Sequence, residues 1–196
     1  AGLIHLTGWD GTTPLVDPLC GSGTLLIEAA SLARQQCPGL QRSFSLEGWA
    51  DFDAELWRDE LERAKRRSQQ QPALAPILGC EQDAAIAEQA RSNVAAAGLD
   101  DCISIHTGDF RDLSLPTGPG VMVCNPPYGV RIGDSDGLEA LYSDLGQFVK
   151  QEASGWAFWL LSGNAAVTGA LRMRASRRIP ISNGGIDCRW LHYDVR

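Results

Sequence analysis

Short apolar segments alternate with longer amphipathic segments along this chain. The apolar segments predict strands at residues 13–17, 77–80, 102–105, 121–124 and 155–161. The longer segments predict helices at residues 24–33 and 138–151, and a further helix that carries Ile86, Ala90, Val94 and Ala97 on one face and ends at Gly98. Strands that alternate with helices predict a doubly wound, mostly parallel α/β sheet.

Two regions depart from this alternation. Residues 37–76 are expected to be an insertion, in which an aromatic stretch is followed by a charged helix. At the other end, two strands around the turn Asn183-Gly184-Gly185 predict an antiparallel hairpin. We therefore expect one domain over residues 1–196. Its first residues look like the inside of a helix and lack an initiator Met, as in a fragment of a larger protein.

Composition and charge narrow the class of protein. Hydrophobic residues make up 44% of the chain and charged residues 21%, which is typical of a globular domain. No apolar run approaches the ~18 residues that cross a bilayer, and no signal peptide is visible. The six cysteines contain no CxxC pair and the three histidines are dispersed, so we expect reduced thiols, a cytoplasmic location and no metal site.

Charge is distributed unevenly. The net charge of −7 argues against a long nonspecific groove for nucleic acid. Beyond Leu171, however, six arginines stand against two aspartates, Asp187 and Asp194. This basic region is either a contact surface for RNA phosphates or an ordinary solvated surface.

Polar residues follow four of the predicted parallel strands, at the point where each strand ends. They are Asp17, Glu81, Asp109 and Asn125. Ligands of doubly wound sheets bind beyond the carboxyl ends of the strands. The sequence therefore predicts a binding site at this edge of the sheet.

The first strand leads into a glycine turn and a helix. The expected cofactor-binding residues here are Asp17, Pro18, Cys20, Gly21, Ser22, Gly23 and Thr24. A Walker A loop is disfavoured because no Gly-Lys-Ser/Thr follows the glycine turn. A dinucleotide-binding fingerprint is also disfavoured, because Leu26 stands where that motif needs Gly or Ala. Asp17 would also repel a pyrophosphate. It fits a cationic ligand, such as the amino acid end of S-adenosylmethionine, although a purely structural turn remains an alternative.

The next two strand ends complete an adenosyl site in this interpretation. Glu81 can accept both ribose hydroxyls, and Asp83 is expected mainly to cap the following helix, with a secondary contact to the cofactor. Asp109 can accept from the adenine amino group, with Phe110 as an apolar wall.

The most specific motif is Asn125-Pro126-Pro127-Tyr128 at the end of the fourth strand. Both prolines lack N–H groups and restrict the backbone, so the loop is stiff. The Asn125 side-chain oxygen and the Pro126 carbonyl can accept the two N–H groups of an exocyclic base amine, and Tyr128 can stack on the base. An unpaired or flipped-out base is required to reach such a pocket. We expect all four residues to be catalytic, and Asn125 also to belong to the cofactor-binding residues.

Together these residues resemble S-adenosylmethionine-dependent amino-methyltransferases of class I. More narrowly, VDPLCGSGTLLIEAA, GCEQD, GDF and NPPYG resemble the THUMP-associated RNA methylase family, with Glu81 where Asp is usual. The resemblance implies a Rossmann-like fold, S-adenosylmethionine as cofactor, and RNA as substrate. It also implies guanine N2 of 23S rRNA or tRNA as the methylated atom, and an RNA-binding THUMP module elsewhere in the protein. The alternatives are adenine N6 in DNA or RNA, a cofactor-binding module without catalysis and, less favoured, a nicotinamide oxidoreductase.

Overall fold

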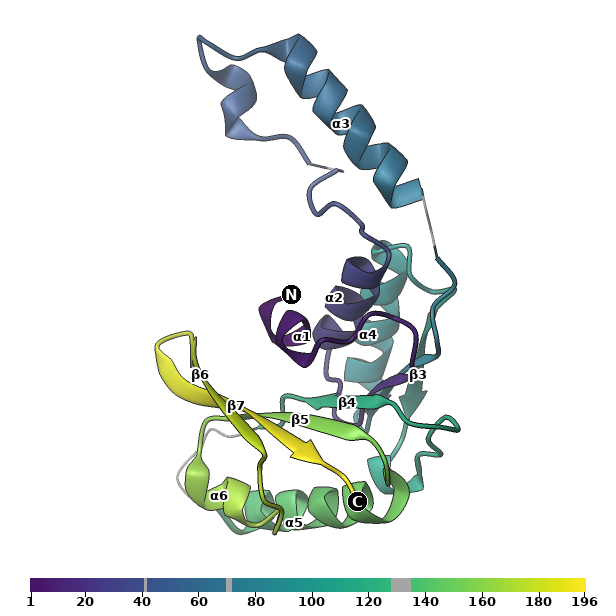
Figure 1. The fold of residues 1–196 in the computed structure, drawn as a ribbon, viewed down its shortest axis with the longest axis vertical. Coiled ribbons are helices and arrows are strands. Elements are labelled where there is room, and N and C mark those ends of the chain that lie inside the picture. The colour runs from purple at the N-terminus through teal and green to yellow at the C-terminus, as the bar shows by residue number, and fades with distance from the viewer. Residues whose placement is uncertain (41, 70–71, 128–134) are drawn as a thin grey trace.

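The structure, a computed structural model, describes residues 1–40, 42–69, 72–127 and 135–196 (Figure 1). Seven strands form one sheet in the order β3-β2-β1-β4-β5-β7-β6. Their bounds are β1 (Leu15–Asp17), β2 (Ile77–Glu81), β3 (Ile103–Thr107), β4 (Val121–Cys124), β5 (Ala157–Ser162), β6 (Arg177–Asn183) and β7 (Ile186–Asp194). The first five strands are parallel, and β7 pairs antiparallel with both β5 and β6. The predicted Rossmann-like sheet with a C-terminal antiparallel hairpin is confirmed.

The strand order changes direction between β1 and β4. From β1 the chain adds β2 and then β3 on one side, and it returns to the other side of β1 to form β4. At such a switch point the two connections leave the sheet toward opposite faces, which opens a crevice at the carboxyl ends of the strands. Asp17 ends β1 and Asn125 follows β4, so both border this crevice.

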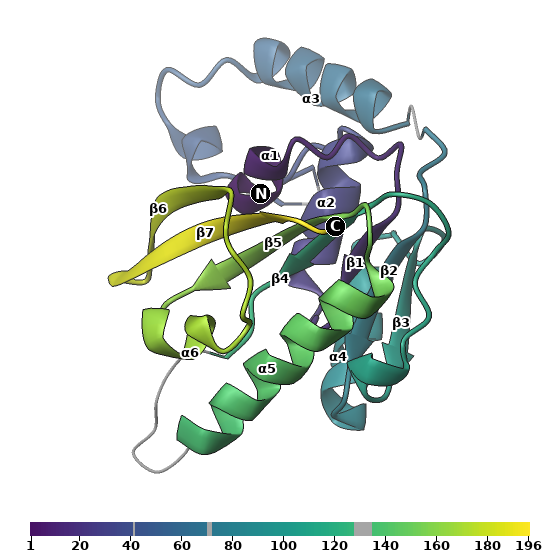
Figure 2. The ribbon, with the colours of Figure 1, turned by 60° about the horizontal axis from the view of Figure 1, so that its bottom comes forward.

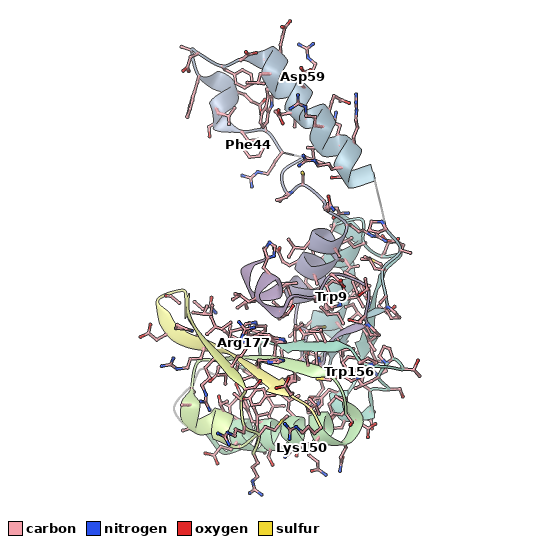
Figure 3. The ribbon with its side chains drawn as sticks, viewed as in Figure 1. Trp9, Phe44, Asp59, Lys150, Trp156 and Arg177 are labelled. Atoms are coloured by element: carbon pink, nitrogen blue, oxygen red, sulfur yellow. The ribbon has the colours of Figure 1, made fainter. Side chains whose placement is uncertain are left out.

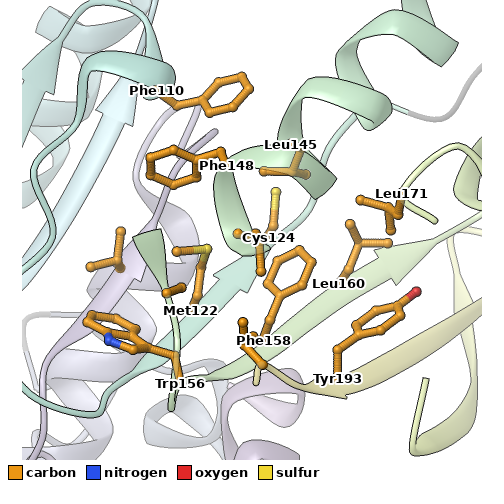
Figure 4. Close-up of a cluster of buried hydrophobic side chains, with 14 of the residues drawn as sticks. Phe110, Met122, Cys124, Leu145, Phe148, Trp156, Phe158, Leu160, Leu171 and Tyr193 are labelled. Atoms are coloured by element: carbon orange, nitrogen blue, oxygen red, sulfur yellow. The ribbon is translucent and has the colours of Figure 1, made fainter. Parts of the chain in front are cut away.

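Helices cover both faces of the sheet (Figure 2). One face carries α1 (Gly2–Thr7), α2 (Thr24–Ala33) and α4 (Ala84–Ala96), and the other carries α5 (Ser135–Glu152) and α6 (Ala165–Gly169). The core beneath α5 contains Phe148 against Phe110 and Phe158 stacked on Tyr193 (Figure 4). The core on the α2 side contains Leu26, Val94 and Trp190.

The insertion forms a separate arm. A short 3₁₀ turn (Ser45–Gly48) and α3 (Ala54–Gln69) project away from the sheet in Figure 1. The Trp57 ring meets Phe44 edge-on at 5.6 Å between centroids and Phe52 at 6.4 Å. The aromatic stretch thus packs on itself, while Trp49 stays 65% exposed.

Element boundaries differ from expectation in a few places. Ile86 is 43% exposed, and the buried face of α4 is instead Ala87, Ala90 and Val94. The prediction for Ile86 was wrong because this face begins one residue later, about 100° around the helix. Helix α6 was not expected. Among the described residues, no helix combines the length and apolar character needed to span a bilayer.

Candidate active site

The glycine turn after β1 is held by backbone contacts to β2. The Cys20 amide donates to the Cys80 carbonyl at 2.9 Å, and Gly23 begins α2 in a left-handed conformation with φ 83°. Helix α2 packs closely on β2 at Gly79, where a Cβ would lie 2.9 Å from Cys20 Sγ and closer still to Leu26. The absence of a side chain at Gly79 therefore allows the turn and the start of α2 to lie directly over the sheet.

A buried carboxylate, that of Asp17, lies beneath this turn. Among the described residues of the crevice, no other charged side chain is buried. Only 2% of Asp17 is exposed, and its Oδ1 accepts from the Leu19 amide at 3.1 Å. The pKa of Asp17 is raised from 3.8 to about 7, mainly by burial; the Leu19 hydrogen bond opposes this shift, and the nearby Glu81 carboxylate adds a smaller contribution to it. A buried carboxylate without a cation has an electrostatic cost that a cationic ligand group would remove.

Glu81, at the end of β2, connects the first two loops. Its Oε2 accepts from the Gly21 amide at 3.2 Å and its Oε1 accepts from the Asp83 amide at 2.9 Å. A carboxylate has about four lone-pair positions, so capacity remains for hydroxyl donors. Asp83 caps α4, accepting from Ala85 and Ile86 amides. Glu81 is therefore fixed by the backbone at the position where the sequence predicts a ribose.

Asp109 follows β3 and begins a short 3₁₀ turn (Phe110–Asp112). Its carboxylate accepts from the Arg111 amide and guanidinium, and these hydrogen bonds lower the pKa of Asp109. The same guanidinium reaches Asp144 on α5 at 3.0 Å. An adenine amino group would therefore share Asp109 with Arg111, a partner that the sequence did not indicate. Phe110 is buried against Phe148, which leaves little of its ring to face a ligand.

The prolyl loop begins where β4 ends. Asn125 is exposed, Pro126 is buried and Pro127 is exposed. The hydroxyl of Tyr142, a fully buried residue of α5, donates to the Pro127 carbonyl at 3.3 Å. Within the described part of the chain, no hydrogen bond occupies the Asn125 amide. Tyr128, the fourth residue of the motif, lies outside the described residues.

A groove of about 690 Å³ opens beside Asn125. Four segments that are far apart in sequence line it: α1, the start of α2, the end of β5, and the end of β6. Its walls are mostly apolar, with polar groups from His5, Glu28 and Ser182. The Glu28 side chain is 42% exposed in this groove. Sequence reasoning missed these residues because no local motif marks them.

The structure brings most of the predicted site residues to one edge of the sheet. Pro18 and Cys20 are buried, and burial raises the pKa of the Cys20 thiol, which stays neutral. Ser22 and Thr24 are exposed at the start of α2, and the Ser22 carbonyl accepts from the Asn93 side chain at 3.0 Å. The donor set fits the expected cofactor: an uncompensated buried carboxylate for a cationic end, and a fixed carboxylate for hydroxyl groups. We find no comparable fit for a pyrophosphate, which both acids would repel.

Comparisons with known proteins agree with this geometry. The family model described as "RMKL-like, methyltransferase domain" (UPF0020) matches residues 1–192. A Synechocystis protein named "Putative RNA methyltransferase slr0064" is 38% identical over 196 residues, which is 100% of this chain and 51% of that protein.

Two solved structures share the fold. SMU.472, described as "a putative methyltransferase complexed with SAH", is 27% identical, with a TM-score of 0.91 over 99% of this chain and 51% of that one. A "predicted N6-adenine-specific DNA methylase" from Listeria monocytogenes is 30% identical, with a TM-score of 0.86 over 100% of this chain and 50% of its own. This chain thus spans about half the length of these relatives.

The family match covers nearly the whole chain and the shared fold includes the β1–β4 crevice. The prediction of S-adenosylmethionine as the cofactor is confirmed at the level of the family. The chain belongs to the RMKL-like methyltransferase domain family.

Proposed function

We propose that this chain transfers a methyl group from S-adenosylmethionine to an exocyclic amine of a base in RNA, with guanine N2 of 23S rRNA or tRNA as the target. The observation that carries the proposal is the position of Asn125-Pro126-Pro127 beside the crevice that Asp17 and Glu81 line. The RNA methyltransferase name of the Synechocystis relative supports RNA as the substrate class.

In the proposed mechanism the chain positions a weak nucleophile. The lone pair of an exocyclic amine is delocalised into the ring, so orientation contributes much of the rate. The Asn125 amide oxygen and the Pro126 carbonyl would accept the two N–H groups and direct the lone pair toward the crevice. The cofactor, when bound, supplies an electrophilic methyl group. The surplus proton leaves to water, since neither an amide nor a peptide carbonyl is a strong base.

Three further groups have positioning roles in this proposal. Tyr142 holds the Pro127 carbonyl from the buried side, so the prolines keep a fixed orientation relative to α5. Asp17 would pair with the cationic end of the cofactor and Glu81 with its ribose. Asp109 would contact the adenine only alongside Arg111.

The carboxylate of Glu28 supports guanine as the target. Guanine presents two adjacent donors, N1–H and N2–H, whereas adenine presents an acceptor at N1 beside its amine. A carboxylate in the groove beside Asn125 can accept from N1–H of guanine, but it would repel N1 of adenine. Adenine N6 is the second candidate, and the name of the Listeria relative favours it.

The size of the relatives supports a further part of the proposal. They are about twice as long as this chain, which is compatible with an additional RNA-binding module of the THUMP type. We propose that such a module supplies affinity for RNA in the whole protein.

The test of the proposed function is the variant Asn125→Ala. We expect turnover on RNA to be lost, because the amine loses one of two acceptors, while calorimetry gives nearly unchanged affinity for S-adenosylmethionine. Gln151→Ala, which removes an exposed amide at the far end of α5, is the matched control and should keep full turnover. Unchanged turnover by the Asn125 variant would refute its role.

A further inference from the structure

A second cavity lies at the opposite edge of the sheet from the catalytic loops. It measures about 530 Å³ and is lined by the cations Lys150, Arg172, Arg174 and Arg196 around an apolar floor that includes Met173 and Tyr193. Lys150 belongs to the last turn of α5 (Figure 3). Arg172 and Arg174 belong to the connection between α6 and β6. We infer that this basic pocket binds the phosphate backbone of the RNA substrate.

The charges of the pocket are not compensated by the protein. Among the described residues, none of the four cations takes part in an ion pair, whereas Arg34, Arg91 and Arg111 each contact a carboxylate. The single acid of the lining, Asp194, is 65% exposed and lies 3.8 Å from His192. Four unpaired cations around one cavity, in a chain of net charge −7, repel one another until a polyanion binds.

The backbone that carries two of these cations is fixed. Leu171 is buried, and its backbone packs so closely on α5 that a side chain at Gly146 would overlap it. Directly after this contact, Arg172 adopts a left-handed conformation with φ 51°, which few residues other than glycine adopt. An arginine thus stands at a position where glycine would be less strained. Its guanidinium is thereby presented from a rigid base, as suits bidentate binding of phosphate.

The position of the pocket determines which RNA can use it. Tyr142, which contacts Pro127, and Lys150, which lines the pocket, are eight residues apart on α5, about 12 Å along the helix axis at 1.5 Å per residue. A single flipped-out base in the catalytic groove would not reach the pocket, whereas the backbone that flanks it in a folded RNA would. This inference rests on the proposed RNA substrate and adds a positioning contact that is remote from the chemistry.

The test is the salt dependence of RNA binding. Fluorescence anisotropy gives the Kd for a labelled RNA hairpin of about 30 nucleotides at salt concentrations between about 50 and 200 mM. For Arg172→Gln/Arg174→Gln we expect weaker binding and a slope of log Kd against log salt that is less steep by about 2, one for each phosphate contact. Methylation of the target as a free nucleoside, which carries no backbone phosphate, should stay unchanged.

Two further variants separate a local contact from other effects. Arg58→Gln/Arg66→Gln, on exposed positions of α3 without ion pairs among the described residues, makes the same change in net charge and should keep the wild-type slope. Arg172→Gly should weaken RNA binding without lowering the thermal midpoint, since glycine adopts φ 51° readily.

Three results would overturn the inference. The first is an unchanged slope in the Arg172→Gln/Arg174→Gln variant, and the second is an equal loss of RNA binding in the α3 control. The third is a double variant that binds RNA normally but binds an acidic polypeptide more weakly than the wild type does.

Failure of the phosphate site can be told apart from failure of the proposed function. If the slope depends on Arg172 and Arg174 but the wild type methylates no RNA, the phosphate site stands and the proposed function fails. If the wild type methylates RNA and the slope does not change, only the phosphate site fails.

Discussion

Replacing Asp17 by Asn should stabilise the cofactor-free protein and weaken its binding of S-adenosylmethionine. Asp17 is 2% exposed and has no cationic partner among the described residues, and burial raises its pKa from 3.8 to about 7. Asparagine has nearly the same shape and its amide oxygen can still accept from the Leu19 amide. The substitution thus removes the charge while keeping the turn.

The magnitude follows from the pKa change. Between pH 3.8 and about 7 the unfolded chain has released the Asp17 proton and the folded chain retains it, so the stability of the wild type falls as pH rises through this window. At 1.36 kcal/mol per pH unit, the penalty above pH 7 reaches about 4 kcal/mol. The side-chain N–H groups of the introduced asparagine are buried without new acceptors, which reduces the gain in stability. We therefore expect the variant to be more stable by about 2–4 kcal/mol at pH 8, or by roughly 5–15 °C in Tm. Below about pH 4 the gain should vanish.

Cofactor affinity should change in the opposite direction. A charge-assisted hydrogen bond contributes about 1.5–3 kcal/mol, so loss of the Asp17 carboxylate should raise the Kd for S-adenosylmethionine roughly 10- to 150-fold. In the wild type, the affinity should fall about tenfold for each pH unit below 7, because binding requires the ionised carboxylate.

Thermal denaturation and calorimetry between pH 4 and 8 measure both effects. Asp187→Asn, in the exposed hairpin, is the control with the same charge change, and it should alter stability by less than about 0.5 kcal/mol. A lower Tm for the Asp17 variant at pH 8, or an unchanged cofactor Kd, would refute the reasoning.

Two other residues give sharp expectations. Tyr142→Phe removes the donor to the Pro127 carbonyl, a hydrogen bond that contributes about 1 kcal/mol. Stopped-assay kinetics should therefore give a kcat that is lower by up to about tenfold, with an unchanged Kd for the cofactor. A higher Kd for the cofactor would argue against a role confined to the prolyl loop. Glu28→Gln should lower discrimination between an RNA with guanine at the target position and one with 2-aminopurine, which keeps the amine but lacks N1–H. Competition kinetics measure the ratio, and equal discrimination by both proteins would remove Glu28 from base recognition.

The fold and the strand-end residues could be predicted because they depend on local pattern. Helix α2 spans the predicted residues 24–33, since Gly23 starts it and the apolar run continues without interruption. Parallel strands place their carboxyl ends at one edge, so Asp17, Glu81 and Asp109 had to lie along the same edge. The role of Ile86 was misjudged because small residues pack α4 against the sheet and the larger side chain stays outside.

The tertiary contacts of the site could not be predicted. Arg111 joins Asp109 to Asp144 across 33 positions, and Tyr142 reaches Pro127 from the middle of α5. The groove beside Asn125 combines α1 with the tip of β6, from opposite ends of the chain. Such contacts depend on how helices settle on the sheet, and no periodicity or motif in the sequence encodes that geometry.

The most direct test of the account is to incubate the protein with S-adenosylmethionine carrying an isotopically labelled methyl group and purified 23S rRNA or tRNA, and then to analyse the nucleosides by mass spectrometry. The account predicts label on an exocyclic amine, as N2-methylguanosine. Label on a ring carbon, a ribose oxygen or a ring nitrogen would contradict the assignment of Asn125 and Pro126 as acceptors for an amine.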